Sequence, residues 1–194
     1  MKHIGRKLYH LAGGLGLLSV YYILGRERAL LFYAALFTIV LAIDGARLLV
    51  PAWNRFVFTR FGAFIRKSEE HTLTGTGPYV LGVGLSLYAY SPEAATAAIC
   101  FLAFGDVSAT AIGERYGRTK VGEKSLEGTA AFIAAATLSG FLLLFMGIHL
   151  PAWIMVLGVL AAAGVELLTL PVNDNLVIPL VSGGVMELLL RFAA

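Results

Sequence analysis

Long apolar blocks alternate with short polar segments along this chain. A membrane-spanning helix needs roughly 20 predominantly apolar residues, and most of the blocks have about that length. Glycine and proline, which tend to end helices, stand at several of the block boundaries. The pattern predicts an all-α polytopic integral membrane helical bundle of about seven transmembrane helices, over residues 8–24, 29–50, 76–90, 94–112, 129–147, 152–170 and 176–192.

The composition excludes an ordinary soluble domain. Of the 194 residues, 58% are hydrophobic and 14% are charged, and the mean hydropathy is +0.80. Soluble domains have about 25% charged residues, so this chain has too little polar surface to dissolve in water. No segment is long or polar enough for a separate soluble domain, and we expect residues 1–194 to form a single membrane-embedded domain. The one cysteine, Cys100, excludes a disulfide framework and a cysteine-based zinc cluster.

The lysines and arginines are distributed unevenly between the two sides of the predicted bundle. All of the 15 except Arg26, Arg28 and Arg191 fall on one side. Cytoplasmic loops of membrane proteins carry an excess of lysine and arginine, so we predict a cytoplasmic N-terminus. Seven spans would then place the C-terminus outside.

The longest polar connection covers residues 51–75. Within it Trp53, Val57, Phe61 and Phe64 recur at helical spacing, with cationic residues between them. A helix of this kind lies in the membrane interface with its apolar face in the lipid. We therefore predict an interfacial amphipathic connection over 51–75, and a gate for a lipid substrate is an alternative interpretation.

Ionisable residues inside apolar helices are informative, because a charge in hydrocarbon costs several kcal/mol. On the predicted topology, acidic residues lie toward the cytoplasmic ends of their helices, and Lys7 begins the first helix at the same level. The acidic residues are Asp44, Asp106, Glu166 and Asp174. Their common depth predicts one polar site at the cytoplasmic boundary.

Residues 113–128 form a segment rich in glycine and lysine, which we predict to be a cytoplasmic nucleotide loop. Glycines let backbone N–H groups approach phosphate oxygens, and cations balance the phosphate charge. Ser125 and Glu127 precede a helix whose N-terminus favours an anion, and a nearby acid such as Asp106 could hold Mg²⁺. Helix packing by small residues and a topology signal are the alternative interpretations. The segment is not a P-loop, because Gly117 is one residue too far upstream and no strand precedes it.

Two further polar clusters are predicted on the same side. The residues Asn173, Asp174 and Asn175 suit a turn and a helix cap. A simple turn does not explain why the acidic residue Glu166 stands near the end of the preceding apolar helix. Glu70 belongs to a polar group at the entry to the third span.

Four short motifs carry a resemblance to a known family. They are Arg6-Lys7-x-x-His10, Gly105-Asp106-x-x-Ala109 with Gly113 and Gly117, Lys124-Ser125-x-Glu127-Gly128, and Glu166 followed by Asp174-Asn175 and Pro179. With these motifs the chain resembles the CTP-dependent polyprenol kinases, a family that includes dolichol kinase, phytol kinase and the yeast-type diacylglycerol kinase and is related to the phosphatidate cytidylyltransferases. The likeness covers most of the chain, which looks like the catalytic core alone because dolichol kinases have many more spans.

The resemblance implies a kinase that transfers the γ-phosphate of CTP to the hydroxyl of a membrane lipid alcohol at the cytoplasmic face. It implies Mg²⁺ or another divalent cation on Asp106 and Asp174, with Glu166 and Asp174 left open as general base or second metal ligand. Lys7 would reach the transferring phosphate. The expected nucleotide-binding residues are Gly105, Gly113, Gly117, Arg118, Lys120, Gly122, Lys124, Ser125, Glu127 and Gly128. The expected substrate-binding or supporting residues are Arg6, His10, Asp44, Glu70, Asn173 and Asn175.

Three other functions compete with this hypothesis. A cytidylyltransferase acting on phosphatidate would release pyrophosphate instead of CDP. A small transporter would need polar residues that continue to the outer side, which is nearly empty of them. A structural assembly protein would show no nucleotide dependence. We expect a nucleoside triphosphate, a membrane lipid and the bilayer as partners, and no nucleic acid.

Overall fold

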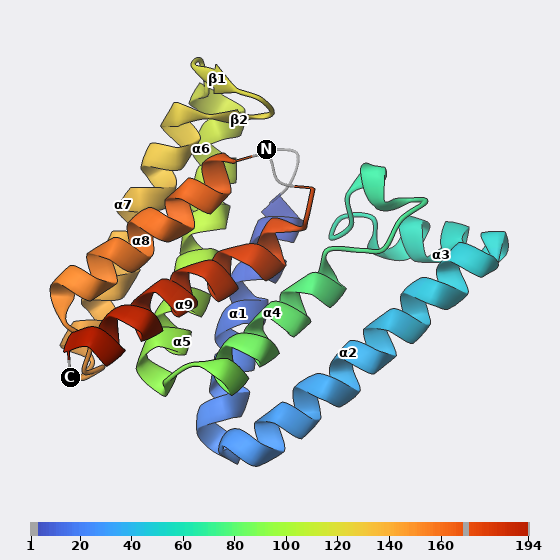
Figure 1. Cartoon of the computed structure of the whole chain (residues 1–194). Coiled ribbons are helices and arrows are strands. Elements are labelled where there is room, and N and C mark those ends of the chain that lie inside the picture. Colours follow the sequence, from blue (N-terminus) through green and yellow to red (C-terminus); the bar gives the residue numbers. More distant parts are fainter. Residues whose placement is uncertain (1–3, 169–170, 194) are drawn as a thin grey trace.

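The computed structural model describes residues 4–168 and 171–193, with the side chains of Ile4, Arg6 and Lys7 excepted. The described chain is almost wholly helical (Figure 1), which confirms the predicted all-α membrane bundle. Among the described residues, four helices are long and apolar enough to cross a membrane, and Leu8–Leu24 and Ala152–Leu167 are shorter apolar helices.

The N-terminal half contains four α-helices and a short 3₁₀ turn. The elements are α1 (Ile4–Leu24), α2 (Arg26–Leu49), α3 (Pro51–Phe61), η1 (Lys67–Glu69) and α4 (Thr76–Ala89). Gly25, with a φ of 76°, makes the sharp turn between α1 and α2. The predicted amphipathic helix begins at Pro51 but ends at Phe61, so the rest of the 51–75 connection is mostly a folded loop.

The C-terminal half contains one long interrupted helix, a small hairpin and three more helices. The elements are α5 (Pro92–Cys100), η2 (Phe101–Asp106), α6 (Val107–Tyr116), β1 (Lys120–Val121), β2 (Lys124–Ser125), α7 (Leu126–Phe145), α8 (Ala152–Leu167) and α9 (Asp174–Ala193). α5, η2 and α6 form one continuous helical run, of which η2 is a π-helical segment. Such π-segments are frequent at functional sites.

The antiparallel pair β1–β2 was not predicted from the sequence. Its two-residue loop is Gly122–Glu123, and Gly122 has a φ of 59°. This positive φ at the first central position is what a type II′ hairpin requires, and glycine provides it without strain. Gly122 therefore shapes the hairpin.

Small residues let the helices pack closely. A Cβ on Gly105 would lie 2.6 Å from the ring of Phe132, and one on Gly158 would lie 2.5 Å from the sulfur of Met186. Both positions join helices across the core, η2 to α7 and α8 to α9. Close approach at small residues is the usual way in which membrane helices associate.

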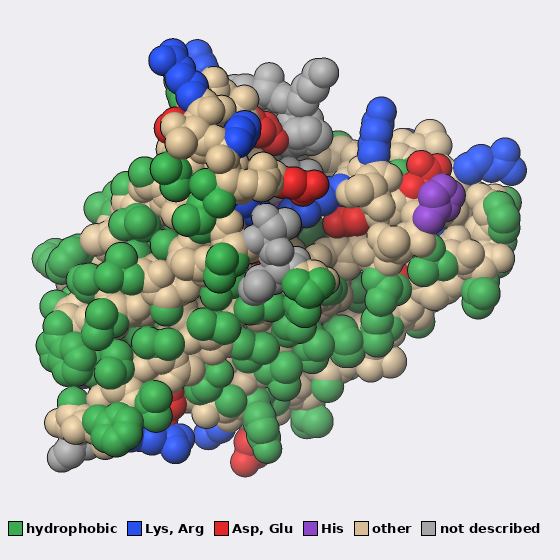
Figure 2. Space-filling model, turned by 45° about the horizontal axis from the view of Figure 1, so that its top comes forward, with side chains coloured by type: hydrophobic (Ala, Val, Ile, Leu, Met, Phe, Trp, Pro, Cys, Tyr) green, Lys and Arg blue, Asp and Glu red, His purple; other side chains and the backbone are tan. Residues whose placement is uncertain are grey.

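The surface separates into an apolar body and charged ends. Figure 2 shows hydrophobic side chains over most of the body, while Lys, Arg, Asp and Glu gather mainly at the end that carries the hairpin and the α3–α4 loop. Helix α7 exposes large apolar side chains, among them Leu138, Phe141 and Phe145. This is the distribution expected of a bundle whose sides face lipid.

Candidate functional site

A polar cavity of about 520 Å³ opens at the charged end of the bundle. Its walls come from five separate parts of the chain: the η2–α6 junction, the hairpin with the start of α7, the end of α8, the start of α9, and the α3–α4 loop. Its charged lining residues are Arg66, Asp106, Glu114, Lys120, Glu123, Lys124, Glu166 and Asp174.

Lys124 is held in the cavity by two carboxylates. Its Nζ donates to Asp174 Oδ2 at 2.7 Å and to Glu166 Oε1 at 3.4 Å. The other carboxylate oxygen of Glu166, Oε2, accepts from Thr129 Oγ1 at 2.7 Å. Glu166 is only 3% exposed, so these contacts orient a buried carboxylate against the lysine. The charged end of Lys124 is therefore fixed in position.

The environment keeps Lys124 protonated. Burial by itself lowers the pKa of this amine, but the hydrogen bond and charge of Asp174, together with the charges of Glu166 and Asp106, outweigh burial and raise the pKa above its ordinary value. Lys124 lies in β2, outside the spanning helices. The cavity thus contains a positive group that can meet a phosphate.

Asp106 is the last residue of η2 and lines the same cavity, half-buried. Ala109, Gly113 and Gly128 line the cavity beyond it. These small residues leave space in front of the carboxylate.

The glycines near the hairpin also serve packing. A Cβ on Gly117 would lie 2.6 Å from Ser125 Oγ, and one on Gly128 would lie 3.0 Å from the carbonyl oxygen of Ala109. Ser125 caps α7, because its Oγ accepts from the backbone N–H of Gly128 at 3.1 Å. The hairpin, α6 and α7 can therefore come together only with small residues at these positions.

Glu127 anchors the hairpin to the start of α7. Its carboxylate accepts from the backbone N–H groups of Arg118 (3.1 Å) and Thr119 (3.0 Å). Its side chain positions the loop and does not line the cavity.

The predicted site residues fall into three groups. Lining the cavity are Asp106, Gly113, Lys120, Lys124, Ser125, Gly128, Glu166, Asn173 and Asp174. Elsewhere in the described structure are His10, Asp44, Glu70, Gly105, Gly117, Arg118, Gly122, Glu127 and Asn175. The side chains of Arg6 and Lys7 lie outside the described residues.

Sequence reasoning missed several polar residues of the site. Those that line the cavity from α6 and the hairpin loop are Thr110, Glu114 and Glu123. Two others, Arg66 and Thr129, come from outside the predicted nucleotide loop. Arg66 lines the cavity from the α3–α4 loop, although in the sequence it counted only as one of the loop cations. Thr129 donates to Glu166 from the first turn of α7. Neither residue belongs to the four motifs, so only the fold could bring them to the site.

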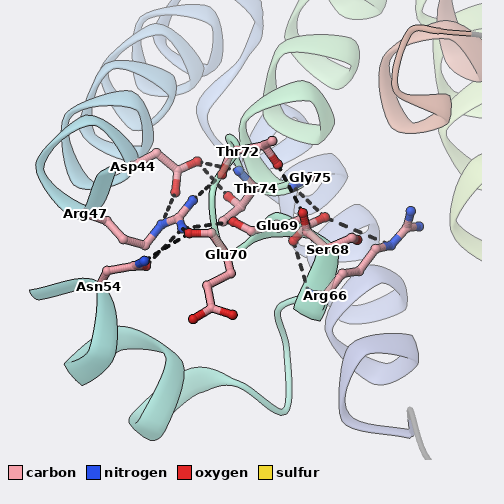
Figure 3. Close-up of polar contacts among 10 residues, drawn as sticks. All are labelled: Asp44, Arg47, Asn54, Arg66, Ser68, Glu69, Glu70, Thr72, Thr74 and Gly75. Atoms are coloured by element: carbon pink, nitrogen blue, oxygen red, sulfur yellow. Dashed lines mark hydrogen bonds and ion pairs between the residues drawn. The ribbon is translucent and has the colours of Figure 1, made fainter. Parts of the chain in front are cut away.

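Asp44 belongs to a separate buried cluster beside the cavity (Figure 3). Its Oδ2 accepts from the backbone N–H of Thr74 at 2.7 Å and from the Thr74 hydroxyl at 2.9 Å, while Oδ1 faces Arg47 Nε at 3.2 Å. The sequence predicted Asp44 in one site with the other acidic residues. This prediction is wrong for Asp44, because it lies beside α4 and not beside α6.

Arg47 fixes the course of the α3–α4 loop. Its guanidinium, 0% exposed, donates to Asn54 Oδ1 (3.1 Å) and to the backbone carbonyls of Glu69 (2.9 Å), Glu70 (3.2 Å) and Thr72. Figure 3 shows that the carboxylate of Glu70 points away from this cluster, so Glu70 takes part only through its backbone.

The same loop is tied to the cavity. Glu69 accepts from the backbone N–H groups of Arg66 at 3.1 Å and Gly75 at 3.3 Å. Asn175 Nδ2, at the start of α9, donates to the carbonyl of Gly75 at 3.1 Å. The buried cluster thus positions Arg66 at the cavity and links the loop to the helix that carries Asp174.

Comparison with curated proteins identifies relatives. The chain is 31% identical to the CTP-dependent diacylglycerol kinase 1 of Saccharomyces cerevisiae over 161 residues, which are 78% of this chain and 53% of the relative. The chain is thus similar, over most of its length, to a CTP-dependent lipid kinase. The proteins of the same name from Eremothecium gossypii (31% identity over 60% of this chain and 37% of the relative) and Schizosaccharomyces pombe (26% over 72% and 71%) are further similar proteins.

The chain spans about half the length of the Saccharomyces relative and 37% of the Eremothecium relative. No protein-family model and no solved structure matches it.

Proposed function

We propose that this chain transfers the γ-phosphate of CTP to the hydroxyl of a membrane lipid alcohol. The observation that carries the proposal is the fixed ammonium of Lys124, which Glu166 and Asp174 hold in a polar cavity lined by Asp106 at one end of an apolar bundle. The relatives are named diacylglycerol kinases, which favours diacylglycerol over a polyprenol or a phytol-like alcohol as the acceptor.

In this reaction the lipid hydroxyl oxygen forms a bond to the γ-phosphorus of CTP. The bond between that phosphorus and the β,γ-bridging oxygen breaks, CDP leaves, and the hydroxyl proton passes to a carboxylate or to water. Phosphoryl transfer depends chiefly on positioning and on neutralising the charge of the phosphates. Lys124, Lys120 and Arg66 all line the cavity and supply that positive charge.

The carboxylates take different roles in the proposal. Both oxygens of Glu166 are engaged, by Lys124 and Thr129, so we assign Glu166 to positioning Lys124 and not to proton transfer. Asp106 and Asp174 face the cavity and are the carboxylates that can accept the hydroxyl proton or hold a cation.

The residues of the cavity fit a divalent cation bound together with nucleotide. Within residues 4–168 and 171–193, no group of three or more His, Cys, Asp or Glu side chains could hold a metal ion. Mg²⁺ is usually bound by only one or two carboxylates plus substrate phosphates, and Asp106 with Asp174 suits that arrangement. When bound, the cation would neutralise charge on the triphosphate.

We infer that the cavity faces the cytoplasm. Most lysines and arginines belong to the loops at its end of the bundle, and Arg26 and Arg191 belong to the opposite end. This bias agrees with the positive-inside rule. A cytoplasmic cavity would have direct access to CTP.

The first prediction tests the reaction itself. Purified protein in lipid nanodiscs, given Mg²⁺ and diacylglycerol, dolichol or phytol, is expected to label the lipid from [γ-³²P]CTP and to release CDP. Parallel reactions with [α-³²P]CTP and either these alcohols or phosphatidate are expected to leave the lipid unlabelled. Labelling of phosphatidate from the α-position with release of pyrophosphate would establish a cytidylyltransferase instead, and no labelling of any of these lipids from either nucleotide would overturn both enzymatic functions.

The second prediction concerns the pH dependence of activity. Because Asp174 raises the pKa of Lys124, the variant Asp174→Asn is expected to lower that pKa, so that the ammonium is lost at a lower pH. The alkaline limb of kcat/KM for CTP, measured on the residual activity, should therefore move to lower pH.

Glu123→Gln is the matched control for this pH experiment. Glu123 lines the cavity but is not among the groups that perturb Lys124, so its removal should leave the alkaline limb in place. If the alkaline limb of kcat/KM falls at the same pH in wild type and in Asp174→Asn, the protonation of Lys124 does not govern activity.

A further inference from the structure

Two apolar grooves run along the membrane-embedded side of α1, α2 and α4. One, of about 390 Å³, is lined by residues such as Gly16, Leu36 and Val80. The other, of about 550 Å³, is lined by residues such as Ile43 and Val57 and extends to the α3–α4 loop.

The two grooves meet at one place. Both are lined by Tyr9, Val40 and Thr76, so they form two branches of one groove. The Tyr9 hydroxyl donates to Thr76 Oγ1 at 3.3 Å at this junction. The branches are therefore largely apolar along their length and have a polar group where they join.

The forked groove adjoins the charged cavity through the α3–α4 loop. Phe64 and Ile65 line the groove, and the next residue, Arg66, lines the cavity. Consecutive Cα atoms are about 3.8 Å apart, so the same short piece of backbone forms part of both walls. Arg47 and Asp44 hold this loop in place (Figure 3).

We propose that the forked groove binds the two hydrocarbon chains of a diacyl lipid alcohol, one chain in each branch, and presents its hydroxyl to the cavity past Arg66. The inference rests on the proposed kinase function for the direction of the hydroxyl. Two apolar branches that join at a polar point match a lipid with two tails on one headgroup, whereas a polyprenol or phytol has a single chain. A lipid held in this way keeps its tails at membrane depth while its hydroxyl reaches the charged end.

Gly16 offers a substitution that fills one branch without disturbing the fold. A Cβ at Gly16 would meet nothing within 4 Å, so the variant Gly16→Leu places its side chain in the groove. An added group in an apolar pocket changes discrimination by about tenfold or more. We expect the KM for long-chain diacylglycerol to rise by about that factor, with the KM for short-chain diacylglycerol and for CTP nearly unchanged.

The matched control is Gly164→Leu. Gly164 is also a helical glycine with nothing within 4 Å of an added Cβ, and it lies on α8, outside both branches. This variant should behave as wild type for every chain length. Equal KM values for long-chain diacylglycerol in wild type and Gly16→Leu would overturn the groove assignment.

A binding measurement separates the groove from the reaction. Wild-type protein in nanodiscs is irradiated with a diacylglycerol that carries a photoactivatable group in each acyl chain, and the labelled peptides are identified by mass spectrometry. Labelling within α1, α2 and residues 62–65, reduced on α1 by Gly16→Leu, supports the groove even if no phosphate is transferred. Labelling confined to α7 and α8 would overturn it even if the protein is an active kinase.

Discussion

Replacing Asp106 with asparagine is expected to lower CTP-dependent lipid phosphorylation on the order of a hundredfold or more, because the cation that we propose on this carboxylate would stabilise transition-state charge by several kcal/mol. Asp106 lines the cavity that also holds Lys124. Asparagine has nearly the same shape, so the π-helical turn around it should remain intact. The measurement is kcat/KM for CTP in nanodiscs, with thermal unfolding as the check on folding.

Glu123→Gln serves again as the control for this experiment. Glu123 lines the same cavity but is an exposed residue of the hairpin loop. It should keep most of the activity, because a solvated carboxylate contributes little to a bound phosphate. An Asp106→Asn protein that is folded and fully active would remove Asp106 from the mechanism.

Replacing Arg47 with methionine is expected to give the largest loss of stability, about 3–5 kcal/mol in the free energy of unfolding. The substitution leaves the buried Asp44 carboxylate without its cation and removes the donor for the carbonyls of residues 69, 70 and 72. Unpaired buried polar groups are costly. For a chain of this length the expected fall in Tm is about 10 °C, measured by thermal unfolding in detergent.

Two further variants test this explanation. The double variant Asp44→Asn with Arg47→Met removes both charges and should recover part of the lost stability, since an unpaired buried charge is the main cost. Arg66→Ala removes a cation from the same loop whose side chain is 48% exposed and whose contact with Glu69 is long, at 4.0 Å. Such pairs contribute little to stability, so Arg66→Ala should keep the Tm and raise the KM for CTP.

An unchanged Tm in Arg47→Met would show that the loop is held by other contacts. We assign Arg47 to ordering the loop and Arg66 to binding the nucleotide. An equal fall in Tm in Arg66→Ala and Arg47→Met would contradict this assignment.

The sequence by itself determined the class of the fold and the depth of the polar residues. Runs such as Arg26–Leu49 and Leu126–Phe145 are apolar over the length of a span, and hydrocarbon accepts a backbone only when its hydrogen bonds are satisfied within the helix. The same reasoning placed Asp106, Glu166 and Asp174 at one level, and the structure brings them around one cavity with Lys124. The family resemblance also rested on residues readable in the sequence.

Only the tertiary structure decided which residues at that level are neighbours. Hydropathy reports how deep a residue lies, but the lateral arrangement depends on which helices pack together. Asp44 was predicted at the same depth as the other acidic residues, yet it lies beside Arg47 and Thr74, because α2 packs on α4. Arg66 carries no sequence motif, and it reaches the cavity because buried hydrogen bonds fold its loop in that direction. Depth is a property of each segment, whereas the site is a property of their packing.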